Sequence, residues 1–162
     1  MKNITFLRHS KSSWEYDVSD LNRPLNEFGI NKIKKVSNLS RDTFGEVEIL
    51  FSSPANRAIH TCIILANTLE IDLKKIIICN ELYTFNMFEV FDFVKQVDDK
   101  FSNILLVGHN PAYTEISNYF SENKILNLPT ARWFSLKFES DNWSDIIDLK
   151  PISYLNNLKS GV

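Results

Sequence analysis

The segment NILLV, residues 103–107, constrains the fold more than any other part of the sequence. Its apolar residues are consecutive, which is typical of a strand covered by helices on both faces. Three further β-rich runs accompany it: NITFL at 3–7, EILFS at 48–52 and KIIIC at 75–79. Segments with helical patterns separate these runs. This alternation of strands and helices predicts a mostly parallel sheet between two helical layers.

Four segments have the apolar spacing of helices. They cover residues 30–39, 54–70 and 88–101, and a short stretch after Pro111. The C-terminal part differs, because ARWFSLKFES and WSDIIDLK flank Asp141-Asn142, which predicts an antiparallel hairpin at the sheet edge. The expected fold class is therefore α/β, a three-layer α/β/α sandwich with a mostly parallel central sheet. Nothing in the pattern assigns a structure to the polar residues after Pro151.

The 162 residues are expected to form a single domain, 1–162, because no repeat and no Pro/Gly/Ser-rich linker divides them. A chain of this length buries a sufficient core without disulfides or structural metal. Cys62 and Cys79 lie in apolar segments and are expected to be reduced and buried, as in the cytoplasm. The sequence lacks a signal-peptide pattern and a membrane-spanning run, so neither export nor a membrane partner is expected.

The net charge of −2 and the pI near 5.9 give no electrostatic reason for binding nucleic acid. The basic residues Lys32, Lys34 and Lys35 fall within a helical pattern and are interpreted as its solvated face rather than as a binding patch. A small, modestly acidic domain of this kind is expected to be a monomer.

Polar side chains follow the predicted strands where the strands end. The first is followed by Arg8-His9-Ser10, the second by the segment from Ser52 to Arg57, the third by Glu81, and the fourth by Gly108-His109-Asn110-Pro111. Ligands of open α/β sheets bind beyond the carboxyl ends of the strands, so these groups mark the expected site.

Arg57 carries its own physical argument. Ser53-Pro54 has the pattern of a helix N-cap followed by proline at the first helical position, which puts Arg57 near the first turn. The helix dipole disfavours a cation there. An anion between Arg57 and the free N–H groups removes the conflict. Asn110-Pro111 repeats the pattern beside His109, so a phosphate pocket is predicted.

A histidine in such a pocket suits phosphoryl transfer. Neutral imidazole has a nucleophilic nitrogen near pH 7, because its ordinary pKa is about 6.5. His9 is therefore the candidate nucleophile, with Arg8, Arg57 and His109 holding the phosphoryl oxygens. Glu81 is the candidate proton donor to the leaving group, although a glutamate after a strand is also commonly a solvated loop residue.

Five ordered segments resemble the histidine phosphatase, or phosphoglycerate mutase-like, superfamily and its short SixA-type phosphohistidine phosphatase branch. They are LRHSKSSW, DLNRPLNEFG, SSPANRAIHT, NELY and GHNP. The resemblance implies that His9 becomes phosphorylated, that Arg8, Arg57 and His109 complete the phosphate pocket, and that Glu81 occupies the acid position. It also suggests Lys11, Ser12 and Asn110 at the rim as substrate-binding residues, with Arg23-Pro24-Leu25 supporting the loop after the first strand. Ser10 and His60 depart from the pattern, in which Gly and Gln are common.

The resemblance further implies an open site, because the segments that build lids in larger relatives are missing. An open pocket suits a phosphorylated histidine on a signalling or phosphotransfer protein. A metal-independent phosphohistidine phosphatase without cofactor is the expected function. The alternatives are a general phosphomonoesterase or small-metabolite phosphatase, and a phosphoprotein-binding module without turnover. No metal site is expected, since the histidines and cysteines lack ligand spacing and the neighbouring arginines would repel a cation.

Overall fold

The computed structural model describes residues 1–159, whose six strands form one mixed sheet with the order β3-β2-β4-β1-β5-β6. The strands are β1 (Lys2–Arg8), β2 (Ile49–Ser52), β3 (Ile76–Ile78), β4 (Asn103–Gly108), β5 (Trp133–Phe138) and β6 (Ser153–Asn156). The first four are mutually parallel, whereas β5 runs antiparallel to β1, and β6 antiparallel to β5.

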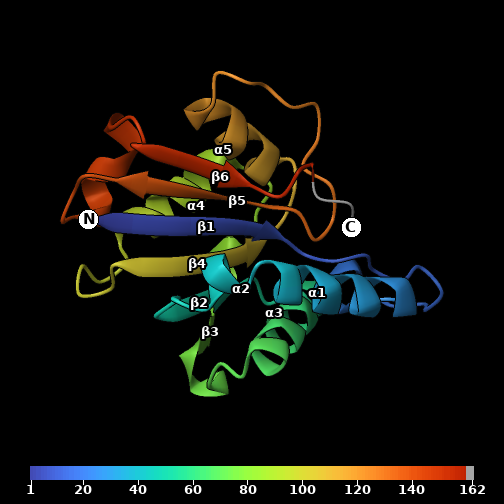
Figure 1. Cartoon of the computed structure of the whole chain (residues 1–162). Coiled ribbons are helices and arrows are strands. Elements are labelled where there is room, and N and C mark those ends of the chain that lie inside the picture. Colours follow the sequence, from blue (N-terminus) through green and yellow to red (C-terminus); the bar gives the residue numbers. More distant parts are fainter. Residues whose placement is uncertain (160–162) are drawn as a thin grey trace.

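Helices cover both faces of the sheet (Figure 1). The main helices are α1 (Glu27–Leu39), α3 (Asn56–Leu69), α4 (Met87–Lys95) and α5 (Ala112–Phe120), and the four-residue α2 (Arg41–Phe44) follows α1. Short 3-10 helices complete the connections: η1 (Asp20–Asn22), η2 (Leu73–Lys75), η3 (Asn80–Leu82) and η4 (Trp143–Asp148). The structure thus confirms the expected α/β layers, and each helix predicted from apolar spacing is present.

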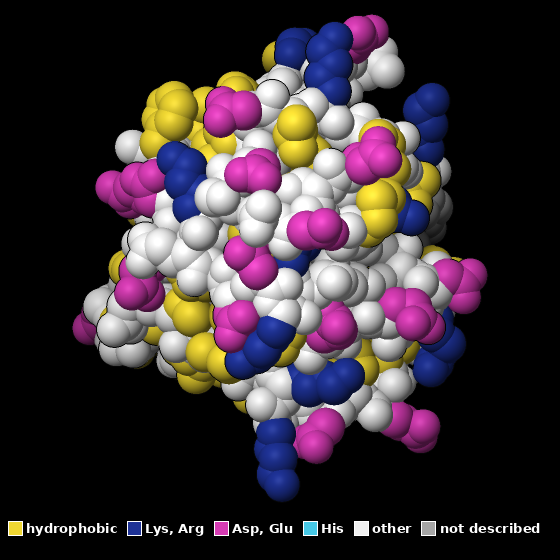
Figure 2. Space-filling model, turned by 90° about the vertical axis from the view of Figure 1, so that its left-hand side faces the viewer, with side chains coloured by type: hydrophobic (Ala, Val, Ile, Leu, Met, Phe, Trp, Pro, Cys, Tyr) yellow, Lys and Arg dark blue, Asp and Glu magenta, His cyan; other side chains and the backbone are white. Residues whose placement is uncertain are grey.

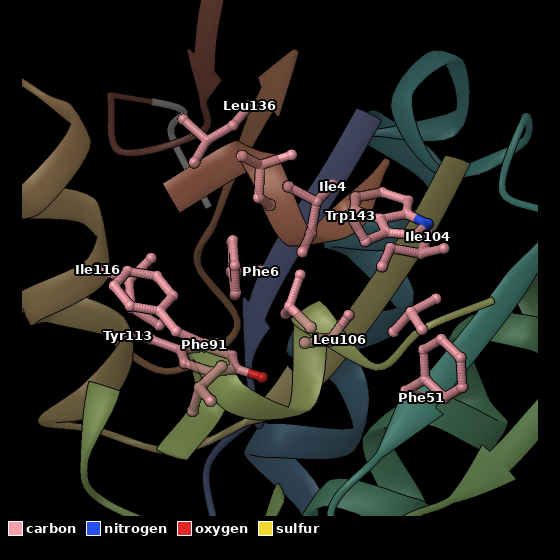
Figure 3. Close-up of a cluster of buried hydrophobic side chains, with 14 of the residues drawn as sticks. Ile4, Phe6, Phe51, Phe91, Ile104, Leu106, Tyr113, Ile116, Leu136 and Trp143 are labelled. Atoms are coloured by element: carbon pink, nitrogen blue, oxygen red, sulfur yellow. The ribbon is translucent and has the colours of Figure 1, made fainter. Parts of the chain in front are cut away.

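Side chains alternate between the two faces along each central strand, as the pleat requires. On β1, Ile4 and Phe6 join the apolar cluster under α4 and α5, which Figure 3 shows in close-up, whereas Leu7 joins the cluster under α1 and α3. On β4, Ile104 and Leu106 belong to the cluster under α4 and α5. Leu105 and Val107 belong to the cluster under α1 and α3. Both faces of these strands are therefore buried, which explains the uninterrupted apolar run in the sequence.

The predicted C-terminal hairpin is correct in its first strand and wrong in its second. β5 forms as expected, but residues 143–148 are the 3-10 helix η4, and the partner of β5 is β6. Trp143 and Ile146 recur after three residues, which is the period of a 3-10 helix, and both are buried. The strand β6 is polar and partly exposed at the sheet edge, so no alternation of apolar residues predicts it from the sequence.

Candidate active site

The carboxyl ends of β1 and β4 bring two histidines together. The strands are parallel neighbours in which Arg8 pairs with Gly108, so the next residues, His9 and His109, emerge side by side. Their ring centroids are 5.2 Å apart, and both side chains are buried. The opposite end of the sheet, where β1 begins, presents mixed acidic and basic side chains and no visible histidine (Figure 2).

Arg57 lies between the two rings. It is the second residue of α3, and its side chain is buried. Its Nε donates to Nε2 of His9 at 3.3 Å, and its Nη2 lies 3.4 Å from Nδ1 of His109. The guanidinium therefore joins both histidines, as expected for a phosphate pocket at the first turn of this helix.

The hydrogen bonds fix the tautomer of His9. Its Nδ1 lies 2.7 Å from the Ser10 carbonyl oxygen, which can only accept, so Nδ1 carries the proton. Nε2 then holds a lone pair, in agreement with the N–H group that Arg57 directs at it. Nε2 is consequently the nucleophilic atom of this ring, and it faces the arginine.

His109 has the opposite tautomer. Its Nδ1 accepts from Arg57, which has only donors, so the proton is on Nε2, 2.7 Å from the hydroxyl oxygen of Ser53. The Ser53 hydroxyl also accepts from the N–H of Ala55 at 3.2 Å. This pair of bonds orients the His109 ring beside His9.

Burial keeps both imidazoles neutral. Desolvation is the main cause that lowers the pKa of His9 to about 3, with His109, Arg57 and Arg8 adding to it against the Ser10 hydrogen bond. Desolvation, followed by Arg57, likewise lowers the pKa of His109 to about 3. At neutral pH the nucleophilic lone pair of His9 is available without an adjacent base.

Asp20 anchors the outer side of Arg57, although no motif or spacing separately assigns it to the site. Its carbonyl oxygen accepts from Nη1 of Arg57 at 2.7 Å and its Oδ2 from Nη2 at 3.0 Å, while Tyr83 donates to the same Oδ2 at 2.6 Å. Arg23 donates to Oδ1 from Nε at 3.2 Å and from Nη2 at 3.0 Å. These donors lower the pKa of Asp20 to about 2 against the raising effect of its partial burial, so the carboxylate stays ionised.

Arg8 and Asn110 meet on the other side of the histidines. Nη1 of Arg8 and the side-chain amide of Asn110 both donate to the Leu128 carbonyl oxygen, at 2.7 and 2.9 Å. Nε of Arg8 is buried and has no hydrogen-bond partner within residues 1–159. It is therefore a free donor next to the pocket.

Within residues 1–159, the remaining predicted site residues make no hydrogen bond to His9, Arg57 or His109. Ser12 is buried and accepts from Arg23 at 2.6 Å, and Lys11 is exposed on the loop after β1. Glu81 is exposed in η3 and lines a groove beside Ile77 and Asp92, and within the described part of the chain it makes no hydrogen bond or ion pair. The structure thus brings His9, Arg57 and His109 together, with Arg8 next to His9 in the chain, whereas Glu81 has no hydrogen bond to either histidine within residues 1–159.

The predicted helix caps are shifted. The N-cap of α3 is Ala55 rather than Ser53. The Ser53 hydroxyl instead makes a hydrogen bond with His109. The N-cap of α5 is Pro111, and the Asn110 side chain accepts from the N–H of Thr114 at 3.2 Å. The N-terminus of α5 still follows His109 in the chain, and the first turn of α3 still contacts both histidines through Arg57. The positive helix ends that the sequence predicts are therefore present.

Reasoning from the sequence did not assign Asp20, Ser53 and Tyr83 to the site. Asp20 opens the quoted segment DLNRPLNEFG, but its contact with Arg57 joins residues far apart in the chain. Tyr83 also packs its ring edge-on to His109, with centroids 5.5 Å apart. Within residues 1–159, no group of three or more His, Cys, Asp or Glu side chains could hold a metal ion, and no helix could cross a membrane.

The sequence matches the family described as "Histidine phosphatase superfamily (branch 1)" over residues 4–87, just over half of the chain. Residues 4–87 contain both arginines and the first histidine of the site. The chain belongs to this superfamily, whose members include phosphatases. No curated protein has a significantly similar sequence.

Solved structures of low identity share the fold. A protein assigned as the phosphohistidine phosphatase SixA from Agrobacterium tumefaciens is 20% identical, with a TM-score of 0.77 and coverage of 95% of this chain and 97% of that chain. The protein histidine phosphatase SixA complexed with tungstate is 19% identical, with a TM-score of 0.73 and coverage of 86% and 91%. A protein assigned as an alpha-ribazole-5'-P phosphatase from Escherichia coli is 15% identical, with a TM-score of 0.66 and coverage of 88% and 93%. The fold is phosphoglycerate mutase-like.

Proposed function

We propose that this protein is a metal-independent phosphohistidine phosphatase that acts through a covalent phospho-His9 intermediate. The observation that carries the proposal is the state of His9: its ring is neutral, its Nδ1 proton is held by the Ser10 carbonyl, and its Nε2 lone pair faces Arg57. A nucleophile with a fixed tautomer and an adjacent cationic donor is what phosphoryl transfer requires of the protein.

In the first step, Nε2 of His9 attacks phosphorus. The Nε2–P bond forms while the bond from phosphorus to the substrate nitrogen breaks, and the departing imidazole takes a proton from solvent. The guanidinium N–H groups of Arg57 and the free Nε of Arg8 hold the phosphoryl oxygens and offset their charge. His109, fixed by Ser53, is close enough to contact the same oxygens.

In the second step, water attacks the phosphorus of phospho-His9. The new O–P bond replaces the Nε2–P bond, inorganic phosphate leaves, and the ring regains its lone pair. The Nδ1 hydrogen bond to Ser10 holds the ring in place through both steps. The cycle uses no metal ion, because the arginines supply the positive charge.

The choice of leaving group supports a P–N substrate over a phosphate ester. An alkoxide leaves only with a well-placed acid, whereas an imidazole leaves readily once solvent protonates it. Asp20, the carboxylate that contacts Arg57, is held ionised by Arg57 and Arg23 and is a poor proton donor. Glu81 is exposed and has no hydrogen bond to either histidine within residues 1–159. The cluster therefore contains no carboxylic acid suited to ester cleavage.

Exposed aromatic side chains beside the site support a protein substrate. Phe85, half-exposed, packs edge-on to His109 with centroids 5.8 Å apart, and Trp14, three-quarters exposed, stacks on Arg23 at 3.7 Å. Such side chains are enriched at protein interfaces. We propose a histidine phosphotransfer domain as the substrate, and a monomeric, cytoplasmic protein as the state in which it acts.

The test is phosphate release from a histidine-phosphorylated phosphotransfer domain, with chelator present throughout. Wild type is expected to release phosphate, His9→Ala to release none, and wild type quenched during turnover to carry an acid-labile phosphate on His9. Comparable rates on phosphoserine or sugar phosphates would favour a general phosphomonoesterase instead. Binding of the phosphorylated domain without phosphate release would indicate a non-catalytic binding module.

A further inference from the structure

A group of cations lies beside the phosphoryl pocket without acidic partners. We call Arg8, Lys11 and Lys32 the basic rim. Arg8 and Lys11 flank the nucleophile in sequence, and Lys32 belongs to α1. None of the three takes part in an ion pair within residues 1–159, although the protein as a whole carries a net charge of −2.

Close packing brings the first turns of α1 against the loop after β1. The Lys11 carbonyl accepts from the N–H of Asn26 at 3.0 Å, and the Ser10 hydroxyl donates to the Gly29 carbonyl at 2.7 Å. The contact at Gly29 is so tight that a Cβ there would lie 2.1 Å from the Lys11 carbonyl oxygen. Lys32 follows Gly29 by three residues and shares its helix face. Lys32 is therefore directed toward the loop that carries His9.

The surroundings of Lys32 distinguish it from the other lysines of the helix. Lys34 and Lys35 are exposed, as expected for a solvated face, whereas Lys32 is half-buried and its ammonium lies 6.0 Å from the Phe28 ring centroid. Burial lowers the pKa of Lys32, and Arg132, Arg8 and Lys11 lower it further by repulsion. The solvated-face interpretation therefore holds for Lys34 and Lys35 but not for Lys32.

We propose that Lys11 and Lys32 of the basic rim form a second anion subsite, beside the phosphoryl pocket that Arg8 lines, and that this subsite binds carboxylate side chains next to the phosphorylated histidine of a protein substrate. This inference rests on the function proposed above. Lys32 is partly buried near like charges, and a substrate carboxylate between Lys11 and Lys32 offsets that repulsion. Asp20 does not serve this purpose, because Arg57 and Arg23 already engage it. The rim thus favours substrates with an acidic sequence around the phosphohistidine.

The test uses three synthetic peptides, each with one phosphohistidine flanked on both sides by two glutamates, two glutamines or two lysines. For wild type we expect kcat/KM for the glutamate peptide to exceed that for the glutamine peptide about three- to fivefold at low salt. This ratio should shrink toward one as the ionic strength rises to about 0.5 M. The lysine peptide should be the poorest substrate.

Lys32→Gln should reduce the glutamate-to-glutamine ratio of kcat/KM to about one. Lys32→Glu should lower this ratio below one and make the lysine peptide the best of the three substrates. Unchanged kcat/KM on the glutamine peptide shows that the variants are folded. Lys35→Gln, on the same helix but exposed, is the matched control and should keep the wild-type ratio. An equal ratio in wild type and Lys32→Gln would overturn the subsite.

The same peptides separate this inference from the proposed function. Release of phosphate from the glutamine peptide without any effect of Lys32 refutes the subsite and leaves the phosphatase. Failure to hydrolyse the three peptides and the phosphorylated phosphotransfer domain refutes the phosphatase. The subsite is then tested by binding of the peptides, measured by fluorescence anisotropy. Preferential binding of the glutamate peptide that Lys32→Gln abolishes supports the subsite, and equal binding overturns it.

Discussion

Replacing Asp20 by asparagine tests how the site orients Arg57. The carboxylate uses both oxygens, Oδ1 for Arg23 and Oδ2 for Arg57 and Tyr83. An asparagine side chain keeps one acceptor oxygen and gains an N–H₂ group, which then faces the N–H donors of one arginine. Asp20→Asn therefore loses either the Arg57 or the Arg23 contact, and it removes the negative charge in both cases.

The size of the effect follows from the exposure of Asp20, whose side chain is 46% accessible. Solvent screening limits a partly exposed ion pair to about 1 kcal/mol, so the free energy of unfolding should fall by about that amount. Arg57 keeps the bond to the Asp20 carbonyl but loses its second anchor. A misorientation cost of about 1.4 kcal/mol in the transition state corresponds to a tenfold lower kcat. The freed positive charge should also bind inorganic phosphate, a ground-state ligand, about threefold more tightly.

The assay measures kcat, the inhibition constant of inorganic phosphate and the urea unfolding midpoint for wild type, Asp20→Asn and Asp17→Asn. Asp17 is exposed in the same loop and is the control for the loss of one charge. In Asp20→Asn alone, we expect a lower kcat together with tighter binding of inorganic phosphate. A wild-type kcat in Asp20→Asn would refute the view that this carboxylate orients Arg57.

Three further predictions concern other residues. The pKa values of His9 and His109 are about 3 in the folded protein and about 6.5 ordinarily, so the unfolded state binds more protons between these values. The free energy of unfolding should therefore fall as the pH drops below about 6.5, by up to about 1.4 kcal/mol per pH unit for each ring. Urea unfolding at a series of pH values should show a weaker dependence of this free energy on pH in His109→Gln, and an equal dependence would contradict neutral buried histidines. Gly29→Ala forces the loop after β1 away from α1 and should cost about 2 kcal/mol or more by thermal unfolding, together with most of the activity, whereas Ser37→Ala, elsewhere on that helix, should keep activity. Glu81→Gln should lower kcat on a phosphohistidine substrate by less than about threefold, and a hundredfold loss would restore Glu81 as the general acid.

The sequence predicts most of the sheet because its central strands are buried on both faces. The β1 and β4 runs are apolar enough to mark their positions, and the residues that follow them mark the site. The edge strand β6 could not be predicted, because Ser153–Asn156 carries polar and apolar residues without a buried face. The error at 143–148 arose because two apolar side chains three residues apart also fit a short strand with irregular alternation.

The central residues of the site could be predicted from their positions after the strands, whereas the surrounding residues could not. His9 and His109 directly follow the parallel neighbours β1 and β4, and Arg57 lies in the first turn of the helix that follows β2. Because β2 is the other parallel neighbour of β4, the topology brings the three side chains together. Asp20 lies in a connection with little regular structure, and its position depends on how residues 13–22 cross the surface. The direction in which η3 turns Glu81 likewise depends on packing around Leu82, which no spacing rule in the sequence expresses.

The arrangement of three arginines around two neutral histidines has a thermodynamic consequence for the protein as a whole. Arg57 and Arg23 are buried, Arg8 is partly buried, and one carboxylate is shared between the first two. An oxyanion in the pocket therefore acts as a structural component of the fold as well as a reactant. A ligand present at one hundred times its dissociation constant adds about 2.7 kcal/mol to the free energy of unfolding. Inorganic phosphate, the product of the proposed reaction, would then stabilise the same molecule that releases it.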